Sequence, residues 1–322
     1  AKAIYAGSDS YFNGVRVGRG PGSDVSNTVL GYAPLGSNTT GVGNTAVGWL
    51  ALGSNNTGNY NTGIGNGALT ANTSGSNNTA IGYLSLYVNT TGANNIAIKA
   101  LNANTTGSNN MALGGLLVNQ TGSRNVGIGI SCLQSLISGD ENIAIGQYSL
   151  YAITGSRNIG IGYFAGRYET GSDTLYIDNR DRGSTAGDKA GAILYGVMNA
   201  TPASQTLTIN AATTISSTTT SSDSNSGALI VKGGIGAASD SWINGIRVGK
   251  GNGSLSNNTA VGLSALNSAT TSNSNTAIGY LALFATTTGG TNVAVGSAAL
   301  KNNTIGTVNV AVGANALYSN VD

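Results

Sequence analysis

The sequence predicts an all-β fold, a parallel β-solenoid built from coils of about 17 residues. Three observations support this prediction. A short motif returns at a nearly fixed spacing, apolar residues alternate within it, and a polar run with glycine separates the copies. The motif is clearest in Asn44-Thr45-Ala46-Val47-Gly48, which returns as Asn61-Thr62-Gly63-Ile64-Gly65 and Asn78-Thr79-Ala80-Ile81-Gly82. A short fixed period is the signature of a repeat architecture.

The spacing of the motif defines two arrays of coils. The leading asparagine occupies positions 27, 44, 61, 78, 95, 110, 125, 142 and 158 in the first array, and 258, 275, 292 and 309 in the second. We therefore expect about nine coils in 27–166 and at least four in 258–322. Helical repeats need about 33 residues or more, so the short period argues against helical coils.

Within one coil, period-two alternation of apolar residues predicts a strand. The β-branched or bulky residues at the second and fourth places share one face, and we expect that face, including Ile81, to point into the coil. The glycine that follows suits a tight corner, and the Ala-Leu pair after it, such as Ala51-Leu52, is expected to begin a second short strand. The run from Gly53 to Gly58 has the composition of a turn.

The third place of the motif holds only small residues after the first coil, which has Val29. We expect this face to point away from the core of its own coil, where small residues favour close packing against another backbone. The natural partner of a thin, repetitive chain is a symmetry copy. The sequence thus predicts a homotrimer, with coils intertwined or side by side, although a monomer with a small-residue face remains open. The predicted axis residues are Ala46, Gly63, Ala80, Ala97, Ala112, Gly127, Ala144, Gly160, Ala260, Ala277, Ala294 and Ala311.

The leading asparagines are expected to stack from coil to coil as an amide ladder, which is a structural role. Composition supports an ordered array, since each coil supplies several bulky apolar side chains although only 8% of residues are charged. The net charge of +2 without a basic cluster argues against nucleic-acid binding, and no apolar run is long enough to cross a membrane. Cys132 is alone, so there is no disulfide framework.

The chain divides into five segments. Residues 1–26 are a lead-in, 27–166 the first array, 167–200 a charged cap or neck, 201–257 a Ser/Thr-rich linker with a second lead-in, and 258–322 a second, incomplete array. The two lead-ins match at an offset of 231, so that Asn13-Gly14-Val15-Arg16 returns as Asn244-Gly245-Ile246-Arg247. Because the chain starts with Ala1 and stops within a coil, we expect a segment of a longer polypeptide.

The segment 167–200 is unusually rich in charge for this chain. A solenoid end exposes unpaired backbone and needs a polar cover, so we interpret the segment as a cap or neck with ion pairs between chains. Asp178-Asn179-Arg180-Asp181 resembles an oxygen-ligand loop for calcium only loosely, because the required spacing and distal acid are missing. We expect no metal site there.

The coils resemble the repeats of tailed-phage tail-fibre proteins and the head repeats of trimeric autotransporter adhesins. The N-T-A-(V/I)-G-x-x-A-L units carry the resemblance, and Ser226-Gly227-Ala228-Leu229-Ile230-Val231 resembles a segment that precedes such repeats in phage fibres. The resemblance implies a trimeric, left-handed parallel β-roll on a virion tail fibre or an extracellular surface. It also implies a role in host-cell attachment, with a bacterial trimeric surface adhesin or a passive extracellular spacer as the alternatives.

Residue types argue against an enzyme. The chain has no histidine, which removes the commonest general base, and its 12 acids lie mostly outside the coils. We expect no catalytic residue, no cofactor and no metal, and the expected partners are copies of the chain and a cell-surface glycan or protein receptor. Aromatic residues after the coil glycine are candidate glycan contacts, with corner packing as the alternative; they are Tyr32, Trp49, Tyr83, Tyr163 and Tyr280.

Overall fold

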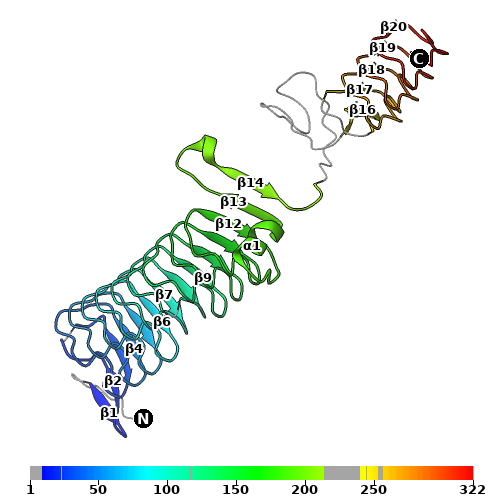
Figure 1. Ribbon diagram of the computed structural model, residues 1–322. Helices are drawn as coiled ribbons and strands as arrows, with labels where there is room; N and C mark the ends of the chain where they lie inside the picture. The colour runs from blue at the N-terminus through cyan, green and yellow to red at the C-terminus, as the bar shows by residue number, and fades with distance from the viewer. Residues whose placement is uncertain are drawn as a thin grey trace. The chain divides into compact units, whose positions relative to one another are not determined.

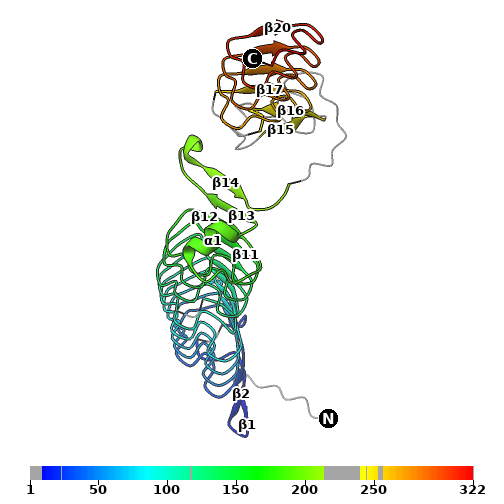
Figure 2. The same cartoon turned by 45° about the vertical axis from the view of Figure 1, so that its right-hand side comes forward.

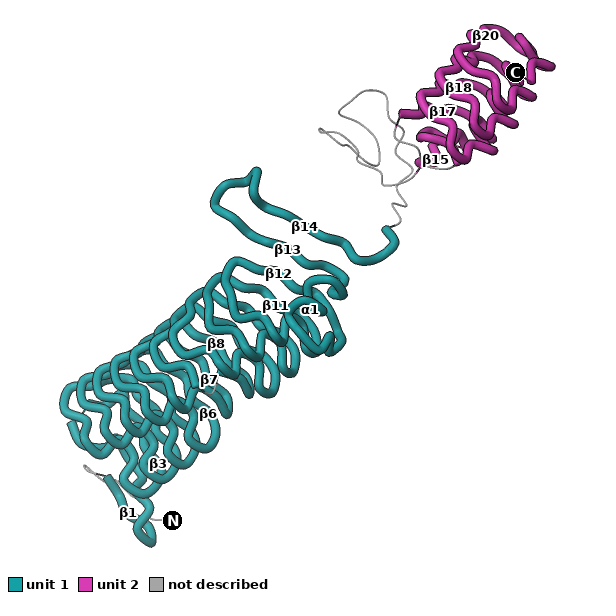
Figure 3. Tube along the Cα trace, viewed as in Figure 1, with its two compact units in different colours: residues 1–214 teal, residues 215–322 magenta. Residues whose placement is uncertain are grey.

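The computed structural model describes residues 9–22, 24–116, 118–213, 240–243, 245–252 and 257–321. The chain forms two compact units, residues 1–214 and 215–322 (Figure 3). Each unit contains one continuous sheet, in which the strands follow one another in chain order. Most of the expected linker, including the phage-like segment at 226–231, lies outside the described residues.

In unit 1, an antiparallel hairpin precedes a stack of parallel strands (Figure 1). The hairpin is β1 (Ser10–Phe12) and β2 (Val15–Gly18). The parallel strands are β3 (Thr28–Gly31), β4 (Thr45–Val47), β5 (Thr62–Ile64), β6 (Thr79–Ile81), β7 (Ile96–Ile98), β8 (Met111–Leu113), β9 (Val126–Ile128), β10 (Ile143–Ile145), β11 (Ile159–Ile161) and β12 (Thr174–Ile177). Strands β3 to β11 each follow one leading asparagine, so the nine expected coils and the parallel β-solenoid are confirmed.

Unit 2 repeats this arrangement on a smaller scale. Its antiparallel hairpin is β15 (Ser241–Ile243) and β16 (Ile246–Gly249). The four expected coils are confirmed by the parallel strands β17 (Thr259–Val261), β18 (Thr276–Ile278), β19 (Val293–Val295) and β20 (Val310–Val312). An equivalent carboxylate contact occurs beside each hairpin. In unit 1, Asp9 accepts from the backbone amide of Arg19 at 2.7 Å, and in unit 2, Asp240 accepts from the backbone amide of Lys250 at 2.7 Å.

Most of each coil is turn rather than strand. The expected second strand at Ala51-Leu52 is wrong, because Leu50 and Leu52 both adopt φ of 53° in a turn. This left-handed conformation costs a non-glycine residue about 1–2 kcal/mol. The cost is offset because Leu52 is fully buried and its amide donates to the Ala68 carbonyl of the next coil at 2.9 Å. Coils are therefore hydrogen-bonded to one another beyond their strands.

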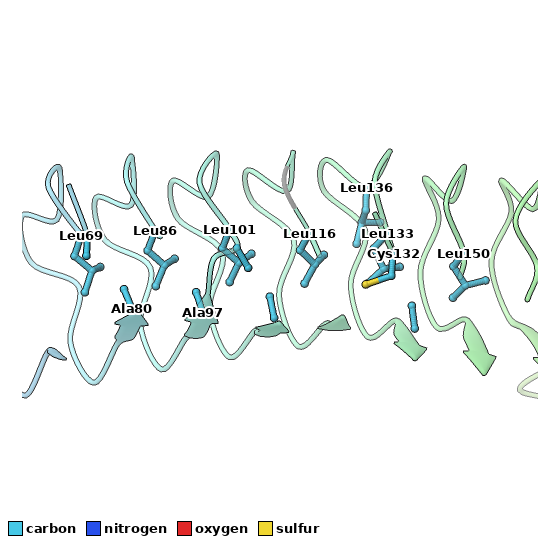
Figure 4. Close-up of a cluster of buried hydrophobic side chains, with 14 of the residues drawn as sticks. Leu69, Ala80, Leu86, Ala97, Leu101, Leu116, Cys132, Leu133, Leu136 and Leu150 are labelled. Carbon is cyan, nitrogen blue, oxygen red and sulfur yellow. The ribbon is translucent and has the colours of Figure 1, made fainter. Parts of the chain in front are cut away.

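The core of each coil lies between the strand and the turn that faces it. In Figure 4, Ala80 and Ala97 point from their strands into the interior that Leu86 and Leu101 also fill, and all four side chains are fully buried. The same holds for unit 2, where Ala277 is fully buried within a cluster of its own. One leucine per level fills most of the interior, which leaves room for only a methyl group or a hydrogen from the strand.

The leading asparagines form the expected ladder, which is confirmed. The backbone amide of Asn44 donates to Oδ1 of Asn27 at 2.8 Å, and the backbone amide of Asn61 donates to Oδ1 of Asn44 at 2.9 Å. The ladder ends at Thr174, whose amide and hydroxyl donate to Oδ1 of Asn158 at 3.0 and 2.7 Å. The side-chain amides of this ladder in unit 1 thus have partners on their own coil and on a neighbouring one, whereas Nδ2 of Asn309 in unit 2 has none among the described residues.

A second ladder, which was not predicted, joins the side chains of asparagines within the polar runs of successive coils. Nδ2 of Asn55 donates to Oδ1 of Asn38 at 3.1 Å, and the series continues to Asn119. The two ladders meet at one carbonyl, since Gly58 accepts from Asn44 at 2.9 Å and from Asn55 at 3.0 Å. Asn55 is therefore buried rather than exposed in a turn. After Asn119 the same place is taken by apolar residues, Leu136 and Ile153, and both are buried.

The end of the first array is covered by β12, the helix α1 (Thr185–Gly191), β13 (Leu194–Val197), a 3-10 turn (Pro202–Ser204) and β14 (Thr206–Ile209). The strands β12, β13 and β14 pair antiparallel. Figures 1 and 2 both show α1 against the end of the coil stack. Its contact is specific, because the Tyr168 amide donates to Asp188 at 3.0 Å and the Thr185 hydroxyl donates to the Tyr168 carbonyl at 2.6 Å.

Candidate interaction surfaces

The face assigned to the oligomer axis is wrong. Every residue at the third place is buried inside its own coil, and none faces outward: Ala46, Gly63, Ala80, Ala97, Ala112, Gly127, Ala144, Gly160, Ala260, Ala277, Ala294 and Ala311. The reason is the leucine of the facing turn. A Cβ on Gly63 would lie 3.3 Å from Cγ of Leu52, so a neighbour within the chain explains the small residue.

The outer face of the sheet carries the second and fourth places instead. Ile64 is 38% exposed and Ile81 37% exposed, which corrects the expectation that Ile81 points inward. Two columns run along β3 to β12, and no charged residue occupies either of them. The column of second places is Thr28, Thr45, Thr62, Thr79, Ile96, Met111, Val126, Ile143, Ile159 and Leu175. The column of fourth places is Leu30, Val47, Ile64, Ile81, Ile98, Leu113, Ile128, Ile145, Ile161 and Ile177. We call these two columns the outer sheet face.

The outer sheet face continues past the last coil. By strand register, Ile161 pairs with Ile177, Ile177 with Leu194, and Leu194 with Ile209. Ile209 on β14 is 48% exposed. Large patches of exposed apolar surface mark interaction sites. The face is therefore a candidate interface along the whole of unit 1.

The five candidate glycan contacts are all exposed at corners of the coils. The exposed fraction runs from 43% for Tyr163 to 70% for Tyr83. Only Tyr32 and Trp49 occupy successive coils, because Asn66 and Ala100 take the equivalent places on either side of Tyr83. Among the described aromatic contacts, none joins two of the five rings. They do not form a continuous file.

Sequence reasoning missed a denser group of rings at the end of the first array. Tyr148 and Phe164 stack with centroids 5.0 Å apart, and Tyr163 contacts Phe164 at 4.0 Å. The Arg167 guanidinium lies 4.5 Å from the Phe164 centroid and 5.2 Å from that of Tyr168. We call Tyr148, Tyr151, Tyr163, Phe164, Arg167 and Tyr168 the aromatic patch. Its signal in the sequence is five aromatic residues between positions 148 and 168.

The described ion pairs of the charged segment join residues of the same chain, and pairs between chains stay a prediction. Arg167 pairs with Asp181 at 2.6 Å, Arg182 with Asp178 at 2.6 Å, and Lys189 with Glu169 at 3.4 Å. These contacts bind the covering residues to the last coil.

The pKa values of two buried acids in this segment are shifted in opposite directions. Burial opposes ionisation of Glu169, but hydrogen bonds from Tyr176, Gly171 and Thr170 together with Lys189 outweigh it and keep its pKa below the ordinary value. Burial raises the pKa of Asp188 to about 6, and nearby Asp178, Asp181 and Glu169 add to this rise. Oδ1 of Asp188 has no hydrogen-bond partner among the described residues.

The described residues contain no group of three or more His, Cys, Asp or Glu side chains placed to hold a metal ion. Asp178, in the loop that loosely resembles a calcium site, is held by Arg182 at 2.6 and 2.8 Å. Burial raises the pKa of the Cys132 thiol to about 12. In the part of the chain that the structure describes, no helix has the length and apolar character needed to span a membrane.

Two kinds of surface thus stand out: the outer sheet face, which is long, apolar and uncharged, and the aromatic groups at the corners. Comparison with known proteins adds no further guide, since no protein-family model, curated protein or solved structure matches the chain.

Proposed function

We propose that the chain is a structural shaft or adhesin segment of a trimeric phage tail fibre used in host-cell attachment. The observation that carries the proposal is the outer sheet face, which leaves an aliphatic side chain at least partly exposed on every coil of unit 1 and bears no charge on β3 to β12. The coil motif supports it through its resemblance to the repeats of such fibres. The segment belongs on a virion tail fibre or another extracellular surface.

The occupant of the outer sheet face is proposed to be two further copies of the chain. The face repeats with the period of the coils, and only a partner with the same period matches it over nine levels. A second copy in parallel orientation has that period by construction, and a cyclic axis along the stack keeps all copies pointing the same way. Three copies are what the resemblance implies.

The test changes the outer sheet face without touching the core. Ile64→Asp combined with Ile81→Asp places carboxylates on two successive coils of a face where each side chain is already partly exposed. In a trimer six carboxylates would meet at the axis, and burying charges without partners costs several kcal/mol. Native mass spectrometry is expected to show trimers for wild type and folded monomers for the double variant.

Ser54→Asp combined with Thr57→Asp is the matched control. It adds the same charge at exposed positions of a corner, and the two side chains make no hydrogen bond among the described residues. The control is expected to remain trimeric. A monomeric wild type, or a face variant that assembles as well as the control, would overturn the trimer and weaken the fibre proposal.

Two alternatives differ in what they require of the surface. A bacterial trimeric adhesin needs the same trimer, so the test above does not separate it from a phage fibre. A passive spacer needs no binding site, whereas the chain exposes Trp49 by 50% and Tyr83 by 70%. Exposed rings favour a segment that contacts a receptor, such as a cell-surface glycan.

A further inference from the structure

The aromatic patch brings together residues of two successive coils and the covering segment. Tyr148 and Tyr151 follow β10, Tyr163 and Phe164 follow β11, and Arg167 and Tyr168 come just after. No other part of the described chain has more than two rings in mutual contact. The patch thus differs from the isolated corner aromatics in being an assembled surface.

The patch is held in place by contacts within the chain. Arg167 lies against four rings, at 5.5 Å from Tyr148, 5.8 Å from Tyr151, 4.5 Å from Phe164 and 5.2 Å from Tyr168. The same guanidinium pairs with Asp181 at 2.6 Å, and the Tyr168 hydroxyl donates to Asp181 at 2.9 Å. A surface ordered before binding loses less conformational entropy when a ligand arrives.

The rings keep free polar edges and partly open faces. Tyr148, Tyr151, Phe164 and Tyr168 are partly exposed, and Tyr163 is 43% exposed. The phenolic hydroxyls of Tyr148, Tyr151 and Tyr163 make no hydrogen bond to any described residue. Tyrosine in this state offers an apolar ring face and a polar tip from one rigid side chain.

This chemistry suits an uncharged ligand with an apolar face and a rim of hydroxyls. The Arg167 charge is already balanced by Asp181, so the patch offers no unpaired cation to an anionic ligand. A neutral pyranose ring has a face of C–H groups for the aromatic rings and hydroxyls for the phenols and Asp181.

We propose that the aromatic patch is a binding site for a neutral hexopyranose ring of a cell-surface glycan. The inference rests on the proposed attachment function and names its site and ligand class. Tyr163, the most exposed ring, provides the main stacking surface together with the open parts of Tyr148 and Phe164, and Asp181 with the phenolic hydroxyls contacts the sugar hydroxyls. Arg167 is the positioning residue that holds the rings and the carboxylate together. One site per chain gives three in a trimer, so weak single contacts act together.

Saturation-transfer difference NMR on the full chain tests this, with methyl β-galactopyranoside and methyl β-glucopyranoside as probes and glucuronate as the anionic comparison. Transfer to the C–H protons of at least one neutral probe is expected, and none above background to glucuronate. Tyr148→Leu combined with Phe164→Leu keeps apolar volume but removes both rings, and is expected to weaken binding about tenfold, which corresponds to about 1.4 kcal/mol. Tyr163→Ser, at an exposed ring, is expected to weaken binding without affecting folding.

Tyr87→Ser is the matched control, because it removes a tyrosine of similar exposure, 40% against 43% for Tyr163, in a turn outside the patch. It is expected to bind the probes as wild type does. No transfer to either neutral probe, or equal transfer to the Tyr163→Ser variant and wild type, would overturn the inference. A trimeric wild type without transfer would reject the sugar site alone, whereas a monomer with transfer dependent on Tyr163 would reject the fibre proposal and keep the site.

Discussion

Replacing Asp188 should alter how the stability of the covering segment depends on pH. Asp188 is 1% exposed on α1, with one oxygen bonded to the Tyr168 amide and the other without a partner among the described residues. The acids that face it are Glu169, Asp178 and Asp181, and the nearby cations Arg182 and Lys189 pair with Asp178 and Glu169. The carboxylate is therefore poorly compensated when ionised.

The magnitude follows from the pKa. Burial first, and then the neighbouring acids, raise the pKa of Asp188 from 3.8 to about 6. A shift of about two units corresponds to about 3 kcal/mol in total. Because the folded state holds the proton more tightly, this stability is fully present below the unfolded pKa and is lost as pH rises through about 6. About 2 kcal/mol of it disappears between roughly pH 4.5 and 7.

Other acids act in the opposite direction at lower pH. The pKa values of Glu169, Asp173 and Asp181 lie below their ordinary values, so these groups destabilise the segment only as pH falls through the lowered values. The range from about pH 4.5 to 7 therefore reports mainly on Asp188. Asp188→Asn removes the titrating group and is expected to flatten the profile over this range.

Hydrogen exchange, corrected for the intrinsic effect of pH, measures local opening of α1. The exchange of the Ala192 backbone amide, which donates to the Asp188 carbonyl at 3.0 Å, is the quantity to monitor. Its opening free energy in wild type is expected to fall by about 2 kcal/mol as pH rises from 4.5 to 7. A flat or rising wild-type profile, or an Asn variant that keeps the slope, would refute the reasoning. Amides of the central coils serve as the internal reference.

Three further outcomes are expected. Gly160→Ala should lower the free energy of unfolding by about 1–3 kcal/mol in denaturant melts, because the new Cβ would lie 2.7 Å from Cγ of Leu150. Gly63→Ala, whose Cβ would lie 3.3 Å from Cγ of Leu52, should change this free energy by less than about 1 kcal/mol. Asn95→Ala removes the side-chain oxygen that accepts from the backbone amide of Asn110 at 2.9 Å, and should lower the free energy of unfolding by about 1–3 kcal/mol. Asn102 is exposed, so Asn102→Ala should leave this free energy nearly unchanged in the same melts. Cys132 should not react with a thiol reagent at pH 8 until the chain unfolds; native reactivity at the unfolded rate would contradict its burial and its pKa of about 12.

The period of the coils, their number and the first asparagine ladder could be predicted because each depends on spacing alone. The inward face could not be read from alternation, which defines two faces without saying which is inside. Alternation alone favours apolar Ile81 as core and Ala80 as surface, yet the interior is so thin that leucines such as Leu86 fill it and leave space only for the methyl group of Ala80. The cue was a leucine six or four residues after every small residue except Gly160, such as Leu86 after Ala80 and Leu101 after Ala97.

The candidate surfaces were predictable to different degrees. Trp49 and Tyr83 were identified correctly as corner residues, and their exposure follows from that place in the coil. The aromatic patch depends on how Arg167 folds back over rings of two coils, which no spacing rule describes. Asn55 was read as turn because it lies in a polar run, although it keeps the same period as the first ladder.

The asparagine ladder has a direction, and this bears on how the chain folds. Each Oδ1 accepts the amide of the following coil, as Asn27 does from Asn44, so a finished coil presents acceptors to the one made next. During synthesis from the N-terminus, every new coil meets a template that is already in place and closes a loop of only 15 to 17 residues. Growth along such a template avoids long-range pairing steps, which are slow in most β proteins. Thr174 takes the last acceptor with its own amide and hydroxyl, and so brings this growth to a stop.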